Sequence, residues 1–328
     1  MYLVYYILTT KYNILNYMPE LPEVTTTVSG INKVAQNLTI KDVWSDWPKL
    51  IKSHKLSAFK REIVGEKILR AERRAKNVLI KLSGEKTLLI HMKMTGHIMY
   101  GKWKQAQRFN LLKAEVEPLK PGWKWIPEDC HDEHPLNDPY NRFLHLILFL
   151  SNGRELALSD TRKFAKVELL NAKSLLENIS LNSLGPEPLD KKLTPKVFKI
   201  QLNKKPNWPI KQALMNQELI AGIGNIYSDE ILWGTGIHPL QKVGTISDAK
   251  MEAMLKSTKK ILKKSIKLGG DSMSDYRNIH GERGGFQNIH NVYRKTGEPC
   301  LKKDGGTIRR IKVAGRSSHF CDKHQRSS

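Results

Sequence analysis

Apolar positions in the first half of the chain follow two different spacings. Between residues 24 and 34 they recur every three or four positions after Pro22, which predicts an amphipathic helix. Beyond it, short apolar runs alternate with turn signals such as Ser83-Gly84, a pattern typical of antiparallel strands in a sandwich or barrel. The predicted strands cover 78–82, 88–92, 143–150, 156–158 and 167–170.

The pattern becomes helical in the second half. Residues 251–266 keep a helical period, with Ser247 as the expected N-cap and Gly269 as the expected end. A helix is also predicted over 211–218, and another starts near Asn225 after a tight glycine turn. Segment 103–141 has no clear period and is interpreted as a long surface insertion, a mobile lid or an added binding surface. The fold class predicted is therefore α+β with several domains.

Composition narrows the range of partners. Lys and Arg number 55 against 32 Asp and Glu, a net charge of +23, which indicates a polyanion and favours nucleic acid. Three cysteines are too few for a disulfide framework, so we expect a reducing, cytoplasmic setting. No apolar run is long enough to span a membrane, so no membrane partner is expected.

The segment MPELPEV at 18–24 carries the first candidate chemistry. If Met18 is the initiator and is trimmed, Pro19 keeps a free secondary amine with a pKa near 8, a usable nucleophile at neutral pH. Addition to a sugar C1′ would give a cationic iminium, and Glu20 would serve as acid or base beside it. The competing interpretation is an ordinary proline-capped helix start. Residues 1–17 do not resemble a signal peptide, and we interpret them as a non-native N-terminal extension.

The same segment resembles the N-terminus of the formamidopyrimidine-DNA glycosylase and endonuclease VIII family of base-excision repair enzymes. The resemblance continues in order over roughly residues 18–324. Its motifs are RRAK at 73–76, HMKMTG at 91–96, DTRKF at 160–164, LGPEPL at 184–189, GIGNIYSDE at 222–230, GIHP at 236–239 and KTGEPC at 295–300.

The resemblance implies a domain plan. A catalytic β-sandwich with flanking helices would occupy 18–172, a linker 173–190 and a helix–two-turn–helix DNA-binding domain 191–290. Within the latter, 269–290 would be a mobile loop that closes over the damaged base. A C-terminal β-hairpin finger would occupy 291–328.

It also implies roles for single residues. Lys76 would contact the phosphate and sugar beside the lesion, although a basic run is more often a solvated face. His91 would bind a phosphate, against the alternative of a buried core histidine. The three residues that fill the gap left by an extruded base would be Met94, Arg162 and Phe164.

Two departures accompany this trio. Lys93 replaces a more usual glycine, and Lys163 a more usual arginine. Neither substitution removes a role that the family pattern assigns.

The glycine turn at 222–224 indicates a binding site independently of the resemblance. N–H groups at the start of the helix near Asn225, with glycines that admit close approach, are expected to form a phosphate site. Lys211 is a candidate companion there, or else a surface lysine.

The finger departs most from the family pattern, which closes with four zinc-binding cysteines. Cys300 and Cys321 remain, His324 replaces one cysteine, and the other is absent. Asp304 is a possible fourth ligand, so both a zinc finger and a zincless hairpin stay open. Arg316 matches the finger arginine that reaches phosphates near the lesion.

Together these features predict a bifunctional glycosylase and abasic-site lyase for oxidised purines (8-oxoguanine and formamidopyrimidines) in duplex DNA. We expect it to act as a monomer with no obligate protein partner. The alternative is a catalytically silent lesion-binding protein, which would follow if Met1 were the true start and Pro19 were locked in an amide.

Overall fold

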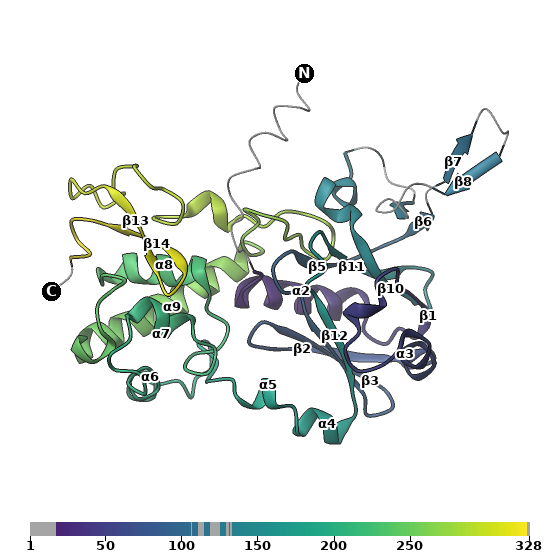
Figure 1. The fold of residues 1–328 in the computed structure, drawn as a ribbon, viewed down its shortest axis with the longest axis horizontal. Helices are drawn as coiled ribbons and strands as arrows, with labels where there is room; N and C mark the ends of the chain where they lie inside the picture. Colours follow the sequence, from purple (N-terminus) through teal and green to yellow (C-terminus); the bar gives the residue numbers. More distant parts are fainter. Residues whose placement is uncertain are drawn as a thin grey trace.

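The computed structural model describes residues 18–105, 107–110, 115–118, 125–128, 131 and 133–326. They form two lobes, a strand-rich lobe and a helical lobe that carries the C-terminal hairpin (Figure 1). The predicted α+β class with several domains is therefore confirmed.

The strand-rich lobe is a sandwich of two four-stranded antiparallel sheets. The sheet order is β1-β10-β11-β5 in one layer and β12-β4-β3-β2 in the other. Leucine, isoleucine and valine from both layers are buried between them, because alternate side chains of each strand point inward. The strands are β1 (Ile40–Trp44), β2 (Ile68–Arg74), β3 (Asn77–Leu82), β4 (Thr87–His91), β5 (Gly96–Gly101), β10 (Leu144–Leu150), β11 (Glu155–Asp160) and β12 (Lys166–Leu170).

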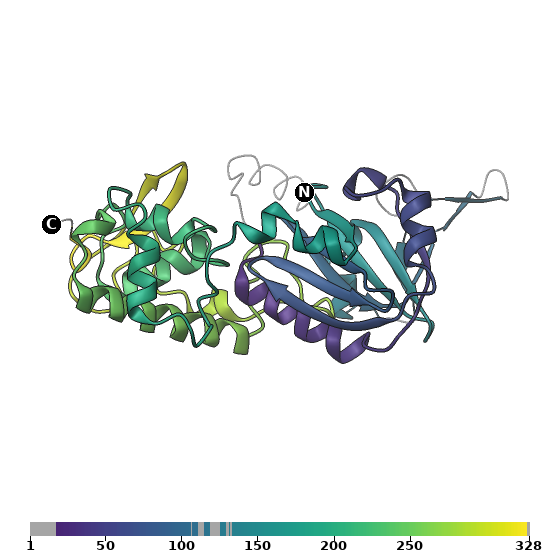
Figure 2. The same ribbon diagram turned by 90° about the horizontal axis from the view of Figure 1, so that it is seen from below.

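All five predicted strands are present, and the pattern missed β1, β2 and β5. Charged residues interrupt β1 and β2, and glycines begin and end β5, so none of them shows a continuous apolar run. Helix α2 (Leu21–Val34) begins at the predicted place, with Pro22 in its first turn, and runs from the junction with the helical lobe along the sandwich (Figure 2). A second helix, α3 (Leu56–Ile63), packs on β1.

The insertion at 103–141 is more regular than expected. Strand β6 (Trp103–Gln105) pairs with β9 (Trp125–Pro127), and β7 (Gln107–Asn110) pairs with β8 (Glu115–Pro118). The missing period therefore gave no indication of these strands. Strands this short carry no readable period, and the base of the extension is fixed by Trp103 and Trp125, which join an aromatic and aliphatic cluster with Trp44.

The helical lobe is built around a separate apolar core. Helix α9 matches the prediction: Ser247 accepts a hydrogen bond from the Lys250 N–H, and the helix ends two residues before Gly269. Helix α8 starts at Asn225 as predicted. Its neighbour α7 ends earlier than the predicted 218, because the Asn216 side chain accepts backbone N–H groups and turns the chain. The helices of this lobe are α6 (Pro195–Leu202), α7 (Ile210–Met215), α8 (Asn225–Thr235) and α9 (Asp248–Lys267). Two short helices between the lobes, α4 (Ala172–Leu176) and α5 (Ile179–Asn182), pack on the strand-rich lobe.

The C-terminal hairpin is formed by β13 (Ile308–Val313) and β14 (Arg316–Cys321). It packs on α8, and its small core contains Val292, Cys300, Ile308 and Cys321. Among the described residues, no helix is both long and apolar enough to cross a membrane.

Candidate active site

The start of α2 is fixed to the glycine turn before α8. The Leu21 N–H donates to the Gly222 carbonyl at 3.0 Å. The Glu20 carboxylate is buried and accepts the N–H groups of Gly224 at 2.5 Å and Ile226 at 3.0 Å. The expected phosphate site is therefore corrected: these two N–H groups at the start of α8 hold a carboxylate of the protein itself. A helix N-terminus suits this role because its N–H groups lack partners within the helix.

Position 224 requires glycine because Glu20 and Lys76 approach its backbone closely. A Cβ at this position would lie 2.4 Å from the carboxyl carbon of Glu20 and 2.7 Å from Nζ of Lys76. Any side chain here would displace both groups. Three segments that are far apart in the sequence, the α2 start, the turn before β3 and the α8 start, thus meet at one point.

Burial shifts the pKa values of Glu20 and Lys76. Loss of water raises the pKa of Glu20, and the positive charge of Lys76 only partly opposes the effect. Burial likewise lowers the pKa of Lys76, opposed by the negative charge of Glu20. Because the two pKa values move towards each other, proton transfer at this point becomes easier than between the same groups in water.

A second carboxyl group lies behind the first. Glu23 accepts the backbone N–H of Glu20 at 2.7 Å, the Tyr227 hydroxyl at 2.5 Å and the Asp271 N–H at 2.7 Å. Burial and the nearby Glu20 raise the pKa of Glu23 to about 8. Glu23 therefore links the start of α2 to α8 and to the loop that begins at residue 269.

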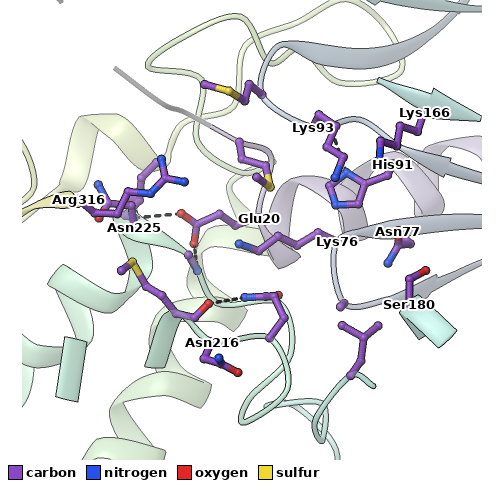
Figure 3. Close-up of a pocket in the computed structure, with 18 of the residues that line it drawn as sticks. Glu20, Lys76, Asn77, His91, Lys93, Lys166, Ser180, Asn216, Asn225 and Arg316 are labelled. Atoms are coloured by element: carbon purple, nitrogen blue, oxygen red, sulfur yellow. Dashed lines mark hydrogen bonds between the residues drawn. The ribbon is translucent and has the colours of Figure 1, made fainter. Parts of the chain in front are cut away.

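Glu20 and Lys76 line a cavity of about 650 Å³ between the two lobes (Figure 3). Its lining is rich in cations, and Arg316 reaches it from the first residue of β14. The sequence analysis assigned no role to Lys166, Trp208 or Gln212, which also line the cavity. The charged and polar lining includes Glu20, Lys76, His91, Lys93, Lys166, Asn225 and Arg316.

His91 is not a core histidine. It lines the cavity, and its Nδ1 accepts the Lys93 N–H at 3.0 Å, which leaves the proton on Nε2. Burial and the charges of nearby lysines lower the pKa of His91 to about 3. A neutral imidazole with Nε2–H available is a hydrogen-bond donor suited to a phosphate oxygen.

Met94, Arg162 and Phe164 lie on two linked turns at the ends of β5 and β11. The Thr95 hydroxyl donates to Asp160, and the Arg162 N–H donates to the Thr95 hydroxyl oxygen at 3.2 Å. The Arg162 guanidinium lies over the Phe164 ring, 4.6 Å from its centroid. The Phe164 side chain is 46 % exposed, so it is not sandwich core.

The two departures noted in the sequence lie at the strained positions of these turns. Lys93 has φ +56° and Lys163 has φ +58°, in the left-handed region that favours glycine. Lys93 therefore carries a backbone strain that the more usual glycine would avoid, whereas Lys163 carries the same strain that arginine would.

Lys211 does not reach the cavity, which corrects its candidate role as a phosphate contact. Its side chain is fully buried, and Nζ donates to the Asn225 carbonyl at 2.8 Å and to Asp229 at 2.7 Å. The buried lysine thus supports the start of α8 from behind.

Two acidic residues that the sequence analysis left without a role fix the hairpin domain to α8. Asp229 also accepts from Ser318 and His319. Glu230 accepts the backbone N–H groups of Asn291, Val292 and Tyr293. The sequence signal for this role was the pair of consecutive acids within an apolar helix, because buried carboxylates need several hydrogen-bond donors.

The finger brings together four potential metal ligands. One donor atom from each of Cys300, Asp304, Cys321 and His324 lies within 4.8 Å of the others. His324 Nε2 faces the Trp233 carbonyl at 3.1 Å, which orients the ring and leaves Nδ1 facing Asp304 Oδ2 at 2.6 Å. Two thiols, an imidazole and a carboxylate gathered this closely are donors that zinc accepts, so the residues present fit a metal ion.

The comparisons with known proteins agree with this geometry. The sequence model of the formamidopyrimidine-DNA glycosylase N-terminal domain matches residues 18–167, and that of the H2TH domain of the same enzyme matches residues 184–277. The chain is 36 % identical to the formamidopyrimidine-DNA glycosylase of Chloroflexus aurantiacus and 34 % identical to that of Pediococcus pentosaceus. These alignments cover 93 % of this chain and 96 % and 98 % of the relatives.

Solved structures give the same result. The Lactococcus lactis Fpg complex with DNA containing an abasic site has a TM-score of 0.76 at 29 % identity, covering 94 % of this chain and all of that one. A structure of MutM with DNA containing carbocyclic 8-oxo-G has a TM-score of 0.76 at 30 % identity and the same coverage. The fold and site thus define a DNA-repair glycosylase. The chain belongs to the formamidopyrimidine-DNA glycosylase family.

Proposed function

We propose that this protein excises oxidised purines from duplex DNA and then cuts the strand, with the amine of Pro19 as nucleophile. The observation that carries the proposal is the buried Glu20 carboxyl group beside Pro19, held by two N–H groups at the edge of a cationic cavity. Damaged duplex DNA is the partner. The cavity cations supply phosphate contacts that do not depend on sequence.

The proposed reaction starts when the Pro19 nitrogen adds to C1′ and the bond from C1′ to the base nitrogen breaks. The base takes up a proton as it leaves, and opening of the sugar ring gives an iminium. Loss of a C2′ proton then expels the 3′ phosphate, and a second elimination expels the 5′ phosphate. Glu20, with its raised pKa, and Lys76, with its lowered pKa, are the groups placed to donate and accept these protons.

Base extrusion is assigned to the linked turns that carry Met94, Arg162 and Phe164. A thioether and an aromatic ring fill the gap, and the guanidinium bonds the unpaired partner base. Oxidised purines are proposed as substrates because the loop from residue 269 and this trio follow the formamidopyrimidine branch. His91, Asn225 and Arg316 are proposed as phosphate contacts on the cavity wall.

The nucleophile requires that translation start at Met18 and that Met18 be removed. The match to the family's N-terminal domain begins at Met18, which supports this start. With any residue ahead of it, Pro19 is a tertiary amide without a nucleophilic electron pair. The protein would then be the lesion-binding alternative.

Borohydride trapping tests the proposal. Protein expressed from its own upstream region is mixed with duplex DNA that carries one 8-oxoguanine opposite cytosine, and the crosslinked peptide is identified by mass spectrometry. An adduct on N-terminal Pro19 is the expected result. Tight binding without an adduct, together with an intact Met1 N-terminus, would establish the silent alternative. A duplex with an abasic site serves as control for the lyase step.

The finger is proposed to hold one Zn²⁺ through Cys300, Asp304, Cys321 and His324. Two thiolates, an imidazole and one carboxylate oxygen form a set that zinc accepts in a tetrahedron. The ion would be structural, and it would fix the hairpin that carries Arg316 to the cavity.

Metal content tests the zinc site. Purified protein is expected to contain one zinc per chain, and Asp304→Ala is expected to weaken zinc binding at least tenfold in chelator competition. Asp322→Ala is the matched control, because this nearby carboxylate bonds Thr307 and Arg309 and is not one of the four donors. Protein without zinc that melts at the same temperature before and after chelation would establish the zincless hairpin.

A further inference from the structure

The end of the insertion contacts the lesion loop, defined here as residues 269–290. Arg277 of this loop is almost fully buried, and all three of its guanidinium nitrogens are used. Nε and Nη2 donate to Asp138 Oδ2 at 2.9 and 2.8 Å. Nη1 donates to the carbonyls of Ser274 and Tyr276 at 2.9 and 2.8 Å. One side chain therefore fastens the loop to the insertion and also fixes the loop's own turn.

Asn141 makes the second contact between these two segments. Its Nδ2 donates to the Gly281 carbonyl at 3.2 Å, and its Oδ1 bonds Nε2 of buried His97 at 2.9 Å. Gly281 has φ +83°, and a Cβ there would lie 3.0 Å or less from Asn141 and Leu136. The two segments are thus packed too closely for a side chain at this position.

The opposite side of the loop is fixed to the catalytic segment. The Asp271 N–H donates to Glu23, and the Tyr276 hydroxyl donates to the Glu23 carbonyl at 3.0 Å. Between these attachments, Asp275 accepts from the Thr161 hydroxyl at 2.6 Å, next to Arg162 of the gap-filling trio. The half-buried tip of the loop, 273–275, is thereby held beside the turn that carries Arg162.

We infer that Asp138 and Arg277 are positioning residues that hold the lesion loop ready for the extruded base before DNA binds. The inference rests on the proposed function and gives the insertion a role in base recognition. A loop that is already ordered does not lose conformational entropy when the base arrives, so selection of the base is stronger. Strand cleavage at a site without a base should not depend on this contact.

Two substrates separate base excision from strand cleavage. Arg277→Lys keeps the charge but loses the two-nitrogen contact, and Asp138→Asn removes the charge of the acceptor. Under single-turnover conditions each variant should excise 8-oxoguanine at least tenfold more slowly than the parent protein. Each should cut a preformed abasic site within twofold of the parent rate. The double variant should be no slower than the slower single variant, because both changes break one contact.

The matched control is Asp42→Asn, which removes a surface ion pair with Lys60 in the same lobe. It should leave both rates unchanged. Equal losses on both substrates would show a merely structural role, and unchanged rates on both would also overturn the inference.

A second measurement does not depend on activity. Backbone amides of 272–282 in the DNA-free protein should be protected from hydrogen exchange, and both variants should lose that protection while α9 keeps it. Unaltered protection in both variants would overturn the inference. If the parent protein shows the protection but does not excise 8-oxoguanine, the proposed substrate fails and the positioning contact stands.

Discussion

The start of α2 and the turns that carry Met94, Arg162 and Phe164 are proposed to act on the same nucleotide, yet the protein holds them in opposite ways. Glu20 is 3 % exposed, and its carboxylate is bonded to backbone groups 204 and 206 residues away. Phe164 is 46 % exposed, and its turn is anchored mainly through Thr95 and Asp160. The proposed reacting group Glu20 is thus fixed in place, whereas Phe164, which is proposed to enter the duplex, is exposed.

Physical chemistry explains the contrast. Proton transfer needs a fixed geometry and a pKa far from the value in water, and both come from burial among oriented donors. A residue that replaces an extruded base must leave its own surroundings and stack in the duplex. An exposed side chain can do so without opening the protein core. Three substitutions test this division.

The largest effect is expected at the buried Glu20. Glu20→Gln keeps the shape and removes the ionisable proton, but its amide oxygen can accept only one of the two N–H groups at the α8 start. Strand cleavage should slow by about 10²- to 10⁴-fold, the usual contribution of a positioned acid or base, while DNA affinity changes little. Single-turnover kinetics and a gel-shift titration measure the two quantities. A loss of activity below tenfold would remove Glu20 from the proton-transfer steps.

An intermediate effect is expected at the exposed Phe164. Phe164→Ala removes a stacking surface worth roughly 1–3 kcal/mol per base, so excision of 8-oxoguanine should slow by about tenfold. The melting temperature should not change, because the ring is largely exposed. Leu240→Ala, at another exposed apolar residue, is the control for surface effects. A fall in melting temperature that accompanies the lost activity would place Phe164 in the core after all.

The smallest effect is a change in the pH dependence of stability. The folded-state pKa of Glu23 is about 8, above its ordinary value, so the protonated form favours folding. This contribution is complete below pH 4.5 and is lost as the pH rises towards 8. Glu23→Gln should therefore flatten the decline in melting temperature between pH 5 and pH 8. Parallel melting curves for the two proteins across this range would contradict the raised pKa.

The sequence predicted well wherever a local pattern carries the information. Helix α9 begins and ends as expected because Ser247 caps it and glycine follows it. The sandwich strands with continuous apolar runs were predicted, but the charged strand β2 was not. The N-terminal motif alone pointed to Pro19 and Glu20, since the proposed nucleophile and the proposed acid or base are neighbours in the chain.

Contacts between distant segments were decided only by the tertiary structure. The N–H groups before α8 bind Glu20 instead of a phosphate, and Lys211 is enclosed against Asp229 instead of lining the cavity. The contact between Asp138 and Arg277 joins residues 139 positions apart. A sequence shows which groups can ionise or donate. Burial and the partners brought by folding decide which of them stay charged, which are used up inside the protein, and which remain for DNA.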